Sequence, residues 1–401
     1  MAVLCFGEIL WDVFPDKEYI GGASYNVAAH VHKLGTETYI YSRLGDDRLG
    51  HNAVEKVQGH GVCTDFVQID QEHPTGTAMV TLDEKAVPTF TITPDTAYDF
   101  IEASEETIEA INKQNFALFY FGTVAQKGEV SRNSLYKILD KCAFKDVFFD
   151  INLRKPFYTE EIIKKSLGYA TILKINDDEL ALVGKMFFGS QEESTVVKAL
   201  YETYPKMATV LITKGPDGAR IYTRETSYDM NYCVSKAVDT VGSGDAFSSG
   251  FIVSYLKGDG IKEAGRIGNI MGDFVASQKG AIPEYDEKKL LMERTRRTVE
   301  NVMGGQGKIH QDFILDEKDL KDKCRLYGDM TMEPGAVLGY HEHHGESETY
   351  YILSGQGFYN DNGVEIPARP GDAFVCRDGC GHGMRNPGNE PLRFMALIIK
   401  G

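Results

Sequence analysis

The chain has 401 residues, 42% of them hydrophobic, and a formal net charge of −16 at pH 7. This length predicts roughly two or three domains with sizeable cores. The excess of acidic side chains argues against a nucleic-acid surface, which needs clustered Lys and Arg. No apolar run approaches the roughly 18 residues of a membrane span, and the first residues lack the basic segment of a secretion signal. We therefore expect a cytoplasmic protein with neither a nucleic acid nor a membrane as its partner.

Residues 1–286 alternate apolar runs typical of strands with segments typical of helices, such as 25–34 and 52–60. The strand-like runs lie at residues 3–6, 38–41, 116–121, 147–149, 172–175 and 210–212. This alternation predicts an α/β fold in which a parallel sheet lies between layers of helices. Segments near 9–20 and 75–92 break the alternation, and we expect them to form a small β lid outside the main sheet.

Two glycines, Gly21 and Gly22, open the first predicted helix, where they let a ligand approach the backbone closely. Asn26 lies in the first turn of that helix, where its amide can donate to and accept from a hydroxyl group. Asp12, at the end of the first strand, is placed to bridge two neighbouring hydroxyls. A glycine turn with Asn26 as helix cap would explain this pattern equally well.

Near residue 240 a loop leads into another helix, and Gly242 and Gly244 flank Ser243 just before Asp245. Glycines before a helix let the backbone approach a phosphate, and the first-turn N–H groups and the helix dipole favour an anion there. We expect the same dipole to keep Asp245 ionised, ready to take the proton of a hydroxyl that attacks phosphorus. A glycine turn capped by Ser243 or Asp245 is the structural alternative.

Together these two segments resemble the signatures of the ribokinase (PfkB) family of sugar kinases, in the family's order. Three intermediate motifs also match: Asp-x-Asn-x-Arg within residues 149–154, Asn-x-x-Glu within 173–180 and Thr-x-Gly within 212–219. Residues 121–132 are similar to the bacterial fructokinase branch. The resemblance covers residues 1–285 and implies a ribokinase-like three-layer α/β/α sandwich that phosphorylates a sugar hydroxyl with ATP and Mg²⁺.

The resemblance implies that Asp245 is the catalytic base and that the backbone of Gly242, Ser243 and Gly244 forms the anion hole for the phosphoryl group. The resemblance also implies sugar contacts at Asp12, Gly21, Gly22, Asn26, Arg154 and Arg132. It implies nucleotide and magnesium contacts at Lys174, Asn176, Glu179, Thr213, Gly215, Gly218 and Asn269. The segment that begins at Asp239 is implied to bind K⁺. Glu179 as a solvated helix residue and Arg132 as a surface charge are the structural alternatives.

The likeness favours fructose as the sugar and fructose 6-phosphate as the product. Kinases of 2-keto-3-deoxygluconate share the Asp-x-Asn-x-Arg segment, in which the arginine, here Arg154, meets a carboxylate. A regulatory sugar-sensing protein with weak kinase activity is an alternative of another class. The lids of fructokinase-like enzymes often pair, and an exposed strand edge in residues 75–92 would favour a partner. We therefore expect a homodimer.

The composition changes near residue 286, and residues 286–300 form a charged segment that we expect to be helical. We take residues 287–305 as a linker or leading arm and residues 306–401 as a second domain. That domain contains short strand-like runs with turn signals about every ten residues, a pattern that predicts a small antiparallel barrel or sandwich.

His341 and His343 lie two apart on a predicted strand, so their side chains project to one face. With Glu348 and His382 from other strands they would form a ligand set suited to Zn, Mn, Fe or Ni. A hydrophilic loop with incidental histidines is the structural alternative. The spacing resembles the cupin family, which implies an all-β jelly-roll barrel, although Arg377 replaces the usual proline of the second cupin motif.

The role of this second domain is open between two possibilities. Some cupins isomerise hexose phosphates at a metal, so a second enzyme acting on the kinase product is one. The other is a non-catalytic module that binds a sugar or a second copy of the chain, and we favour this one because the cupin fold alone does not specify chemistry.

Overall fold

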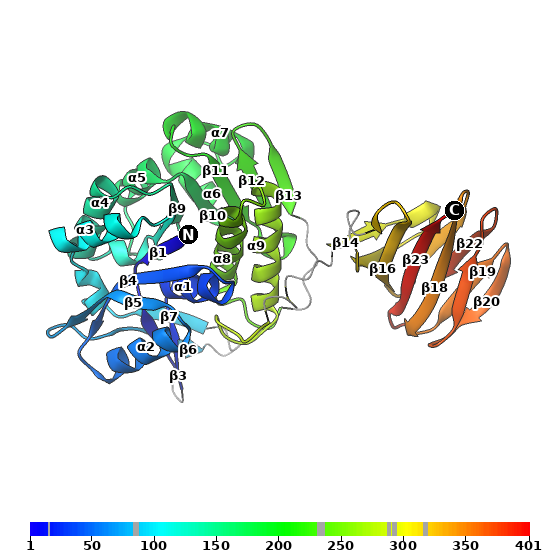
Figure 1. The fold of residues 1–401 in the computed structure, drawn as a ribbon, viewed down its shortest axis with the longest axis horizontal. Coiled ribbons are helices and arrows are strands. Elements are labelled where there is room, and N and C mark those ends of the chain that lie inside the picture. The colour runs from blue at the N-terminus through cyan, green and yellow to red at the C-terminus, as the bar shows by residue number, and fades with distance from the viewer. Residues whose placement is uncertain (15–16, 83–87, 231–236, 287–289, 291–294, 316–319) are drawn as a thin grey trace. The chain divides into compact units, whose positions relative to one another are not determined.

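The computed structural model describes the chain except residues 15–16, 83–87, 231–236, 287–289, 291–294 and 316–319. The chain divides into two compact units, Met1–Glu287 and Lys288–Gly401 (Figure 1). Within the described residues, no helix is both long enough and apolar enough to cross a membrane.

The first unit is built on a nine-stranded sheet. In sheet order its strands are β13 (Ser227–Met230), β12 (Ala219–Thr223), β11 (Thr209–Thr213), β10 (Ile172–Asn176), β9 (Asp146–Asp150), β8 (Leu118–Gly122), β1 (Ala2–Phe6), β4 (Glu37–Gly45) and β5 (Cys63–Asp70). The strands from β11 to β5 pair in parallel, whereas β12 and β13 form an antiparallel edge. All five residues of β1 are buried, as expected for a strand covered on both faces.

Helices cover both faces of this sheet and confirm the predicted three-layer arrangement. One face carries α1 (Ala23–Lys33), α8 (Ser243–Lys257) and α9 (Ile261–Ala276); the other carries α3 (Glu105–Gln114), α4 (Glu129–Lys141), α5 (Glu160–Tyr169), α6 (Asp177–Phe187) and α7 (Glu193–Thr203) (Figure 1). The second group shares a core with alternate β1 side chains, including Leu4 and Phe6. Short 3₁₀ turns lie at η1 (Ala97–Phe100), η2 (Val124–Gln126) and η3 (Gly215–Asp217).

The second predicted helix, 52–60, begins earlier than expected, at α2 (Arg48–Gly59). The side chain of Asp47 accepts a hydrogen bond from the Gly50 N–H at 2.8 Å and so caps the helix. The sequence pattern missed this start because the first turn carries few apolar residues.

The two segments that interrupt the alternation form a separate four-stranded sheet in the order β3 (Glu18–Gly21), β2 (Leu10–Val13), β6 (Gly76–Leu82) and β7 (Pro88–Ile92). β2 pairs in parallel with β6, and the other two pairs are antiparallel. Residues 15–16 and 83–87 of the predicted lid lie outside the described residues. The sheet places Asp12 opposite Tyr19 and Ala78, next to the start of α1.

The second unit consists of two antiparallel sheets and confirms the predicted all-β fold. The strands of the larger sheet are, in order, β14 (Thr295–Glu300), β15 (Lys308–Phe313), β16 (Cys324–Met332), β23 (Leu392–Lys400), β18 (Glu346–Ser354) and β21 (Ala373–Cys376). Those of the smaller sheet are β17 (Val337–Glu342), β22 (Gly381–Arg385), β19 (Gly357–Asp361) and β20 (Val364–Ala368). Side chains from both sheets, among them Met330, Tyr359 and Phe394, share one core.

The predicted helix at 286–300 is wrong for its last part. Residues 295–300 form β14, which pairs antiparallel with β15, and η4 (Val302–Gly304) follows. A charged segment with helical spacing becomes a strand here because β15 offers hydrogen-bond partners along one side of its backbone. Residues 287–289 and 291–294 of the predicted linker lie outside the described residues.

Candidate active site and metal centre

Asp245 lies in the first turn of α8, which Gly242 begins in the left-handed conformation (φ 77°). Among the described residues no side chain caps this helix start, so capping by Ser243 or Asp245 is wrong. Ser243 instead donates its hydroxyl to the Thr240 carbonyl at 2.9 Å. The first helical hydrogen bond runs from the Ala246 N–H to the Gly242 carbonyl, so the preceding amides of the first turn remain outside the helical ladder.

Asn26 meets Asp245 across 219 positions of sequence. Its side-chain amide donates to a carboxylate oxygen of Asp245 at 2.8 Å. Asn26 lies inside α1 rather than at its cap, because Gly22 occupies the N-cap position. The first turn of α1 is held by Glu8, whose Oε1 accepts the Ala23 N–H at 2.9 Å. The alternative in which Asn26 caps the helix is therefore wrong.

Lys174 brings a positive charge to the start of α8. Its Nζ lies 3.1 Å from Oδ1 of Asp150, and a Cβ atom placed on Gly244 would come within 3.0 Å of the same Nζ. Asp150 is fully buried and also accepts the Ser248 hydroxyl at 3.0 Å. Burial opposes the charge on Lys174, but Asp150 and its acidic neighbours raise the pKa of Lys174 above its usual value.

Three carboxyl groups of the site have raised pKa values. Burial and the negative charge of Asp150 raise the pKa of Asp245 to about 6, against the hydrogen bond from Asn26. Burial, with a contribution from Asp245, raises the pKa of Glu8 to about 7. Burial and the charge of Asp239 raise the pKa of Asp12 to about 6. The helix start therefore does not lower the pKa of Asp245, since the surrounding protein outweighs the dipole.

Asn176 and Glu179 form a reciprocal capping box at the start of α6. Asn176 Oδ1 accepts the Glu179 N–H at 2.8 Å, and Glu179 Oε2 accepts the Asn176 N–H at 3.0 Å. The other oxygen of Glu179 accepts the Leu153 N–H at 2.8 Å. Glu179 is buried, so it is not a solvated helix residue. This motif orders the connection after β9 as well as the helix.

The two arginines differ in their surroundings. Arg154 is exposed, and its charge is close enough to Asp245 to lower the pKa of that carboxyl. Arg132 lies on α4, where it donates to the Gln126 carbonyl at 2.7 Å. The carboxylate of Asp239 accepts the N–H groups of Val241 and Gly280, both at 3.1 Å, and thereby orders the loop before α8.

A cavity of about 260 Å³ lies between η3, α8 and α9. The residues predicted to contact the nucleotide around it are Thr213, Gly215, Gly218 and Asn269, and Ser243 and Gly244 of the predicted anion hole complete the same wall. Phe247 and Ala276 supply apolar surface. The cavity thus places apolar surface beside the start of α8.

In the second unit His341, His343, Glu348 and His382 converge, with ligand atoms all within 4.8 Å of one another. β17 and β22 of the smaller sheet carry His341 and His382 opposite each other, His343 follows β17, and Glu348 comes from β18 of the larger sheet. The Glu348 carboxylate lies 2.9 Å from His382 Nε2 and 3.2 Å from His343 Nε2. His344 is 75% exposed and pairs with Glu342 instead.

The opposite nitrogen of each ring is anchored. His341 Nδ1 donates to the Gly339 carbonyl at 3.0 Å, His343 Nδ1 donates to Glu346 at 2.9 Å, and His382 Nδ1 lies 3.0 Å from the Tyr359 hydroxyl. Such partners leave the Nε2 lone pairs pointing at the centre of the cluster. The Nε2 atoms of His343 and His382 lie 3.0 Å apart, a distance at which either a proton on one ring or a metal ion relieves the repulsion of two lone pairs. The residues therefore fit a divalent ion.

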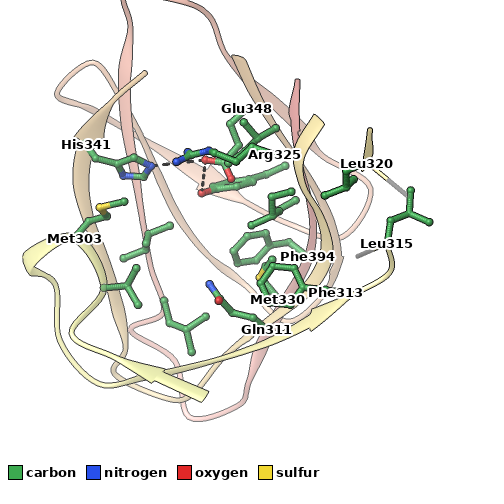
Figure 2. Close-up of a pocket in the computed structure, with 17 residues that line it drawn as sticks. Met303, Gln311, Phe313, Leu315, Leu320, Arg325, Met330, His341, Glu348 and Phe394 are labelled. Atoms are coloured by element: carbon green, nitrogen blue, oxygen red, sulfur yellow. Dashed lines mark hydrogen bonds and ion pairs between the residues drawn. The ribbon is translucent and has the colours of Figure 1, made fainter. Parts of the chain in front are cut away.

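A larger cavity, of about 630 Å³, opens beside this cluster (Figure 2). His341, Glu348 and Arg325 lie at one end, while Leu320, Phe313, Met330 and Phe394 line the remainder.

Sequence reasoning missed Glu8 in the first unit and Arg325 in the second, and it assigned no role to Asp150, the first residue of the Asp-x-Asn-x-Arg motif. Glu8 and Asp150 lie at the carboxyl ends of β1 and β9, where parallel sheets place their ligands. Their position at the ends of predicted strands was the sequence signal that could have marked both residues as site residues. The sequence offers no such signal for Arg325, because its place beside the metal cluster depends on how β16 packs across the barrel.

Residues 5–288 match the pfkB family of carbohydrate kinases, and the chain belongs to this family. It is therefore a phosphotransferase of an ATP-using family. Probable fructokinase-5 of Arabidopsis thaliana is 30% identical over 325 residues, which cover 73% of this chain and 98% of that protein. The structure of a fructokinase from Xylella fastidiosa with bound ATP has a TM-score of 0.62 at 20% identity, covers 70% of this chain and 93% of that chain, and confirms the fold.

Residues 328–398 match the cupin domain, which confirms the second predicted fold. An oxalate-binding protein of Thermotoga maritima is 38% identical over 107 residues, which cover 27% of this chain and 88% of that protein. The chain is thus a carbohydrate kinase followed by a cupin domain.

Proposed function

We propose that the first unit transfers the γ-phosphoryl group of ATP to fructose and forms fructose 6-phosphate. The observation that carries this proposal is the meeting of Asp245, Asn26 and Lys174 at the start of α8. A base, a hydroxyl-binding amide and a cation thus surround the amides that would receive a phosphoryl group. The fructokinase names of the relatives support the choice of sugar.

In this proposal Asp12 and Asn26 hold sugar hydroxyls, and Asp245 takes the proton of the attacking hydroxyl. The first-turn amides of α8 and Lys174 neutralise charge on the phosphoryl group, which suits a loose transition state. ATP occupies the cavity that Asn269 and Gly215 line. The Glu179 carboxylate suits a hard cation such as Mg²⁺, and Mg²⁺ would neutralise the phosphates when bound. K⁺ near Asp239 would further order the loop before α8.

A substrate screen tests the sugar. Purified protein with ATP and Mg²⁺ is expected to show a higher kcat/KM for fructose than for ribose or 2-keto-3-deoxygluconate, with the product identified by mass and by NMR. Absence of a preference for fructose overturns the substrate assignment. A second candidate is an acid such as 2-keto-3-deoxygluconate, favoured by Arg154, whose charge acts on Asp245 and is suited to a carboxylate.

We propose that the second unit binds a divalent transition metal, Zn, Mn, Fe or Ni, through His341, His343, Glu348 and His382. The support is the convergence of three anchored imidazoles on one carboxylate. We further propose that it is a binding module, since the apolar cavity walls offer few partners to a hexose phosphate. Metal analysis of the full chain and of His382→Ala tests the site, with His344→Ala as control. Equal metal content in His382→Ala and the control overturns it.

We also propose a homodimer, because β7 is a terminal strand of the four-stranded sheet and, among the described residues, pairs with β6 alone. Light scattering on the full chain is expected to give twice 44.6 kDa. A mass of one chain at micromolar concentration overturns this proposal.

A further inference from the structure

The cavity beside the metal cluster has one polar end, and its other walls are apolar except for Gln311. Most of its 17 lining residues are hydrophobic (Figure 2). Its volume, about 630 Å³, falls in the range of small-molecule sites, roughly 300–1,000 Å³. The occupant of such a space gains affinity mainly by burying apolar surface.

The polar residues of the lining are few, and all but Gln311, which lies beside Met330, gather at the end that holds the metal cluster (Figure 2). They are Gln311, Arg325, His341, Glu348 and Tyr350. His341 and Glu348 belong to the metal cluster, and Tyr350 donates its hydroxyl to Glu348 at 3.1 Å. A sugar carries a hydroxyl on nearly every carbon, and each hydroxyl buried without a partner costs free energy. The walls therefore disfavour a sugar or sugar phosphate.

The charges at the polar end favour one negative charge on the ligand. A divalent ion and Arg325 bring three positive charges, whereas Glu348 and Glu346 bring two negative charges. Arg325 pairs with Glu346 through Nη2 at 2.6 Å, and a guanidinium has further N–H donors that suit a carboxylate. One positive charge thus remains in excess beside the metal.

We propose that the cupin cavity binds a monocarboxylate with an apolar tail. Its carboxylate lies between the metal and Arg325, and its tail lies along Leu326, Met330 and Phe394. This inference rests on the proposed metal site and specifies its ligand. A two-carbon dianion such as oxalate would reach the metal but leave these apolar walls in contact with water.

The test uses the full chain loaded with Mn²⁺ and calorimetric titration with 2-oxo acids of increasing length, from pyruvate to 2-oxooctanoate. Affinity is expected to rise about four-fold for each added methylene, the equivalent of about 0.8 kcal/mol. Affinity that does not rise with chain length, or tighter binding of oxalate than of every 2-oxo acid, overturns the inference.

Two variants separate the head from the tail. Arg325→Gln is expected to weaken all the acids by a similar factor, and the exposed Arg369→Gln serves as its control. Leu326→Ser is expected to reduce the gain per methylene, whereas Val364→Ser, at a position 64% exposed in the same unit, is not. If Leu326→Ser converts a dimer to a monomer and no acid binds the wild type, the cavity is an interface between two copies and the inference is wrong.

Metal content measured on the same samples distinguishes the two proposals. Protein that retains no Mn²⁺ contradicts the metal site itself. Protein that retains Mn²⁺ but binds the acids without dependence on chain length contradicts only the ligand class.

Discussion

Asp245 is basic enough to accept a proton and yet ionised at neutral pH. Its pKa of about 6 lies well above the ordinary value of 3.8 because burial and Asp150 disfavour the charge. A base works best when its pKa lies near the working pH. The raised pKa therefore strengthens the role that the helix start alone suggested.

The pH dependence of kcat/KM follows from this pKa. Protonation removes the base, so we expect kcat/KM for the sugar to fall about ten-fold per pH unit below pH 6. Asp12 also has a pKa of about 6, and the Asp12→Asn variant should keep the decline because Asp245 still titrates. Steady-state rates from pH 5 to 8 check this. A rate that stays level down to pH 5 contradicts the assignment.

Glu8 should lower stability at neutral pH. Folding raises its pKa from 4.5 to about 7, so the unfolded chain releases the proton more readily. The stability that the protonated group provides is lost progressively as pH rises from about 4.5 to 7. Glu8→Gln should therefore stabilise the first unit at pH 8, by on the order of 3 kcal/mol, and change little at pH 4.5.

Urea unfolding at the two pH values measures the effect of Glu8→Gln, with the exposed Glu106→Gln as control. A wild type more stable than Glu8→Gln at pH 8 would show that the ionised carboxylate is needed at the start of α1.

Single residues were predictable from sequence where a motif specified them, as for Asp245 and His382. The residues that contact them were harder to predict from the sequence. The contact between Asn26 and Asp245 joins two helices that are adjacent in space only. The capping box of Asn176 and Glu179 follows a local pattern, but its burial comes from the packing of α6 against the sheet.

At the scale of elements, the start of α8 requires glycine at one position. Gly242 is left-handed, and a Cβ there would lie 2.6 Å from the Cβ of Ala281. Gly258 at the other end of α8 is also left-handed (φ 86°) but has open space around it. Gly242→Ala should therefore lower kcat and cost more than the about 1–2 kcal/mol of left-handed strain, whereas Gly258→Ala should show that strain alone.

Steady-state kinetics and urea unfolding of the two glycine variants check this comparison. Equal loss of activity in both would mean that helix strain, and not displacement of the loop before α8, controls the rate.

Periodicity predicted the alternation of strands and helices because most elements bury one apolar face. It failed at 295–300, where pairing with β15 overrides helical spacing. It also missed the first turn of α2, which a polar cap from Asp47 specifies. In both places hydrogen bonds rather than apolar burial decide the local structure.

At the scale of the whole molecule, each site takes all its residues from one unit and each unit has its own core. A ligand stabilises the part of a protein that binds it. Calorimetry should therefore show two thermal transitions, one raised by ATP with Mg²⁺ and the other lowered by a chelator of transition metals. His382→Ala should abolish the chelator effect while leaving the ATP effect. A single transition that shifts with both additions contradicts this prediction.

If Asp245 is the base for phosphoryl transfer from ATP to a sugar, the Asp245→Asn variant should lose this transfer while it still binds ATP. The asparagine keeps the shape of the site but cannot accept the proton, so kcat for sugar-dependent ADP release should fall about 10²–10⁴-fold. ATP affinity should stay near that of the wild type, and the exposed Asp65→Asn should behave as wild type. Turnover retained in Asp245→Asn, with product formed at a comparable rate, would show that Asp245 is not the base.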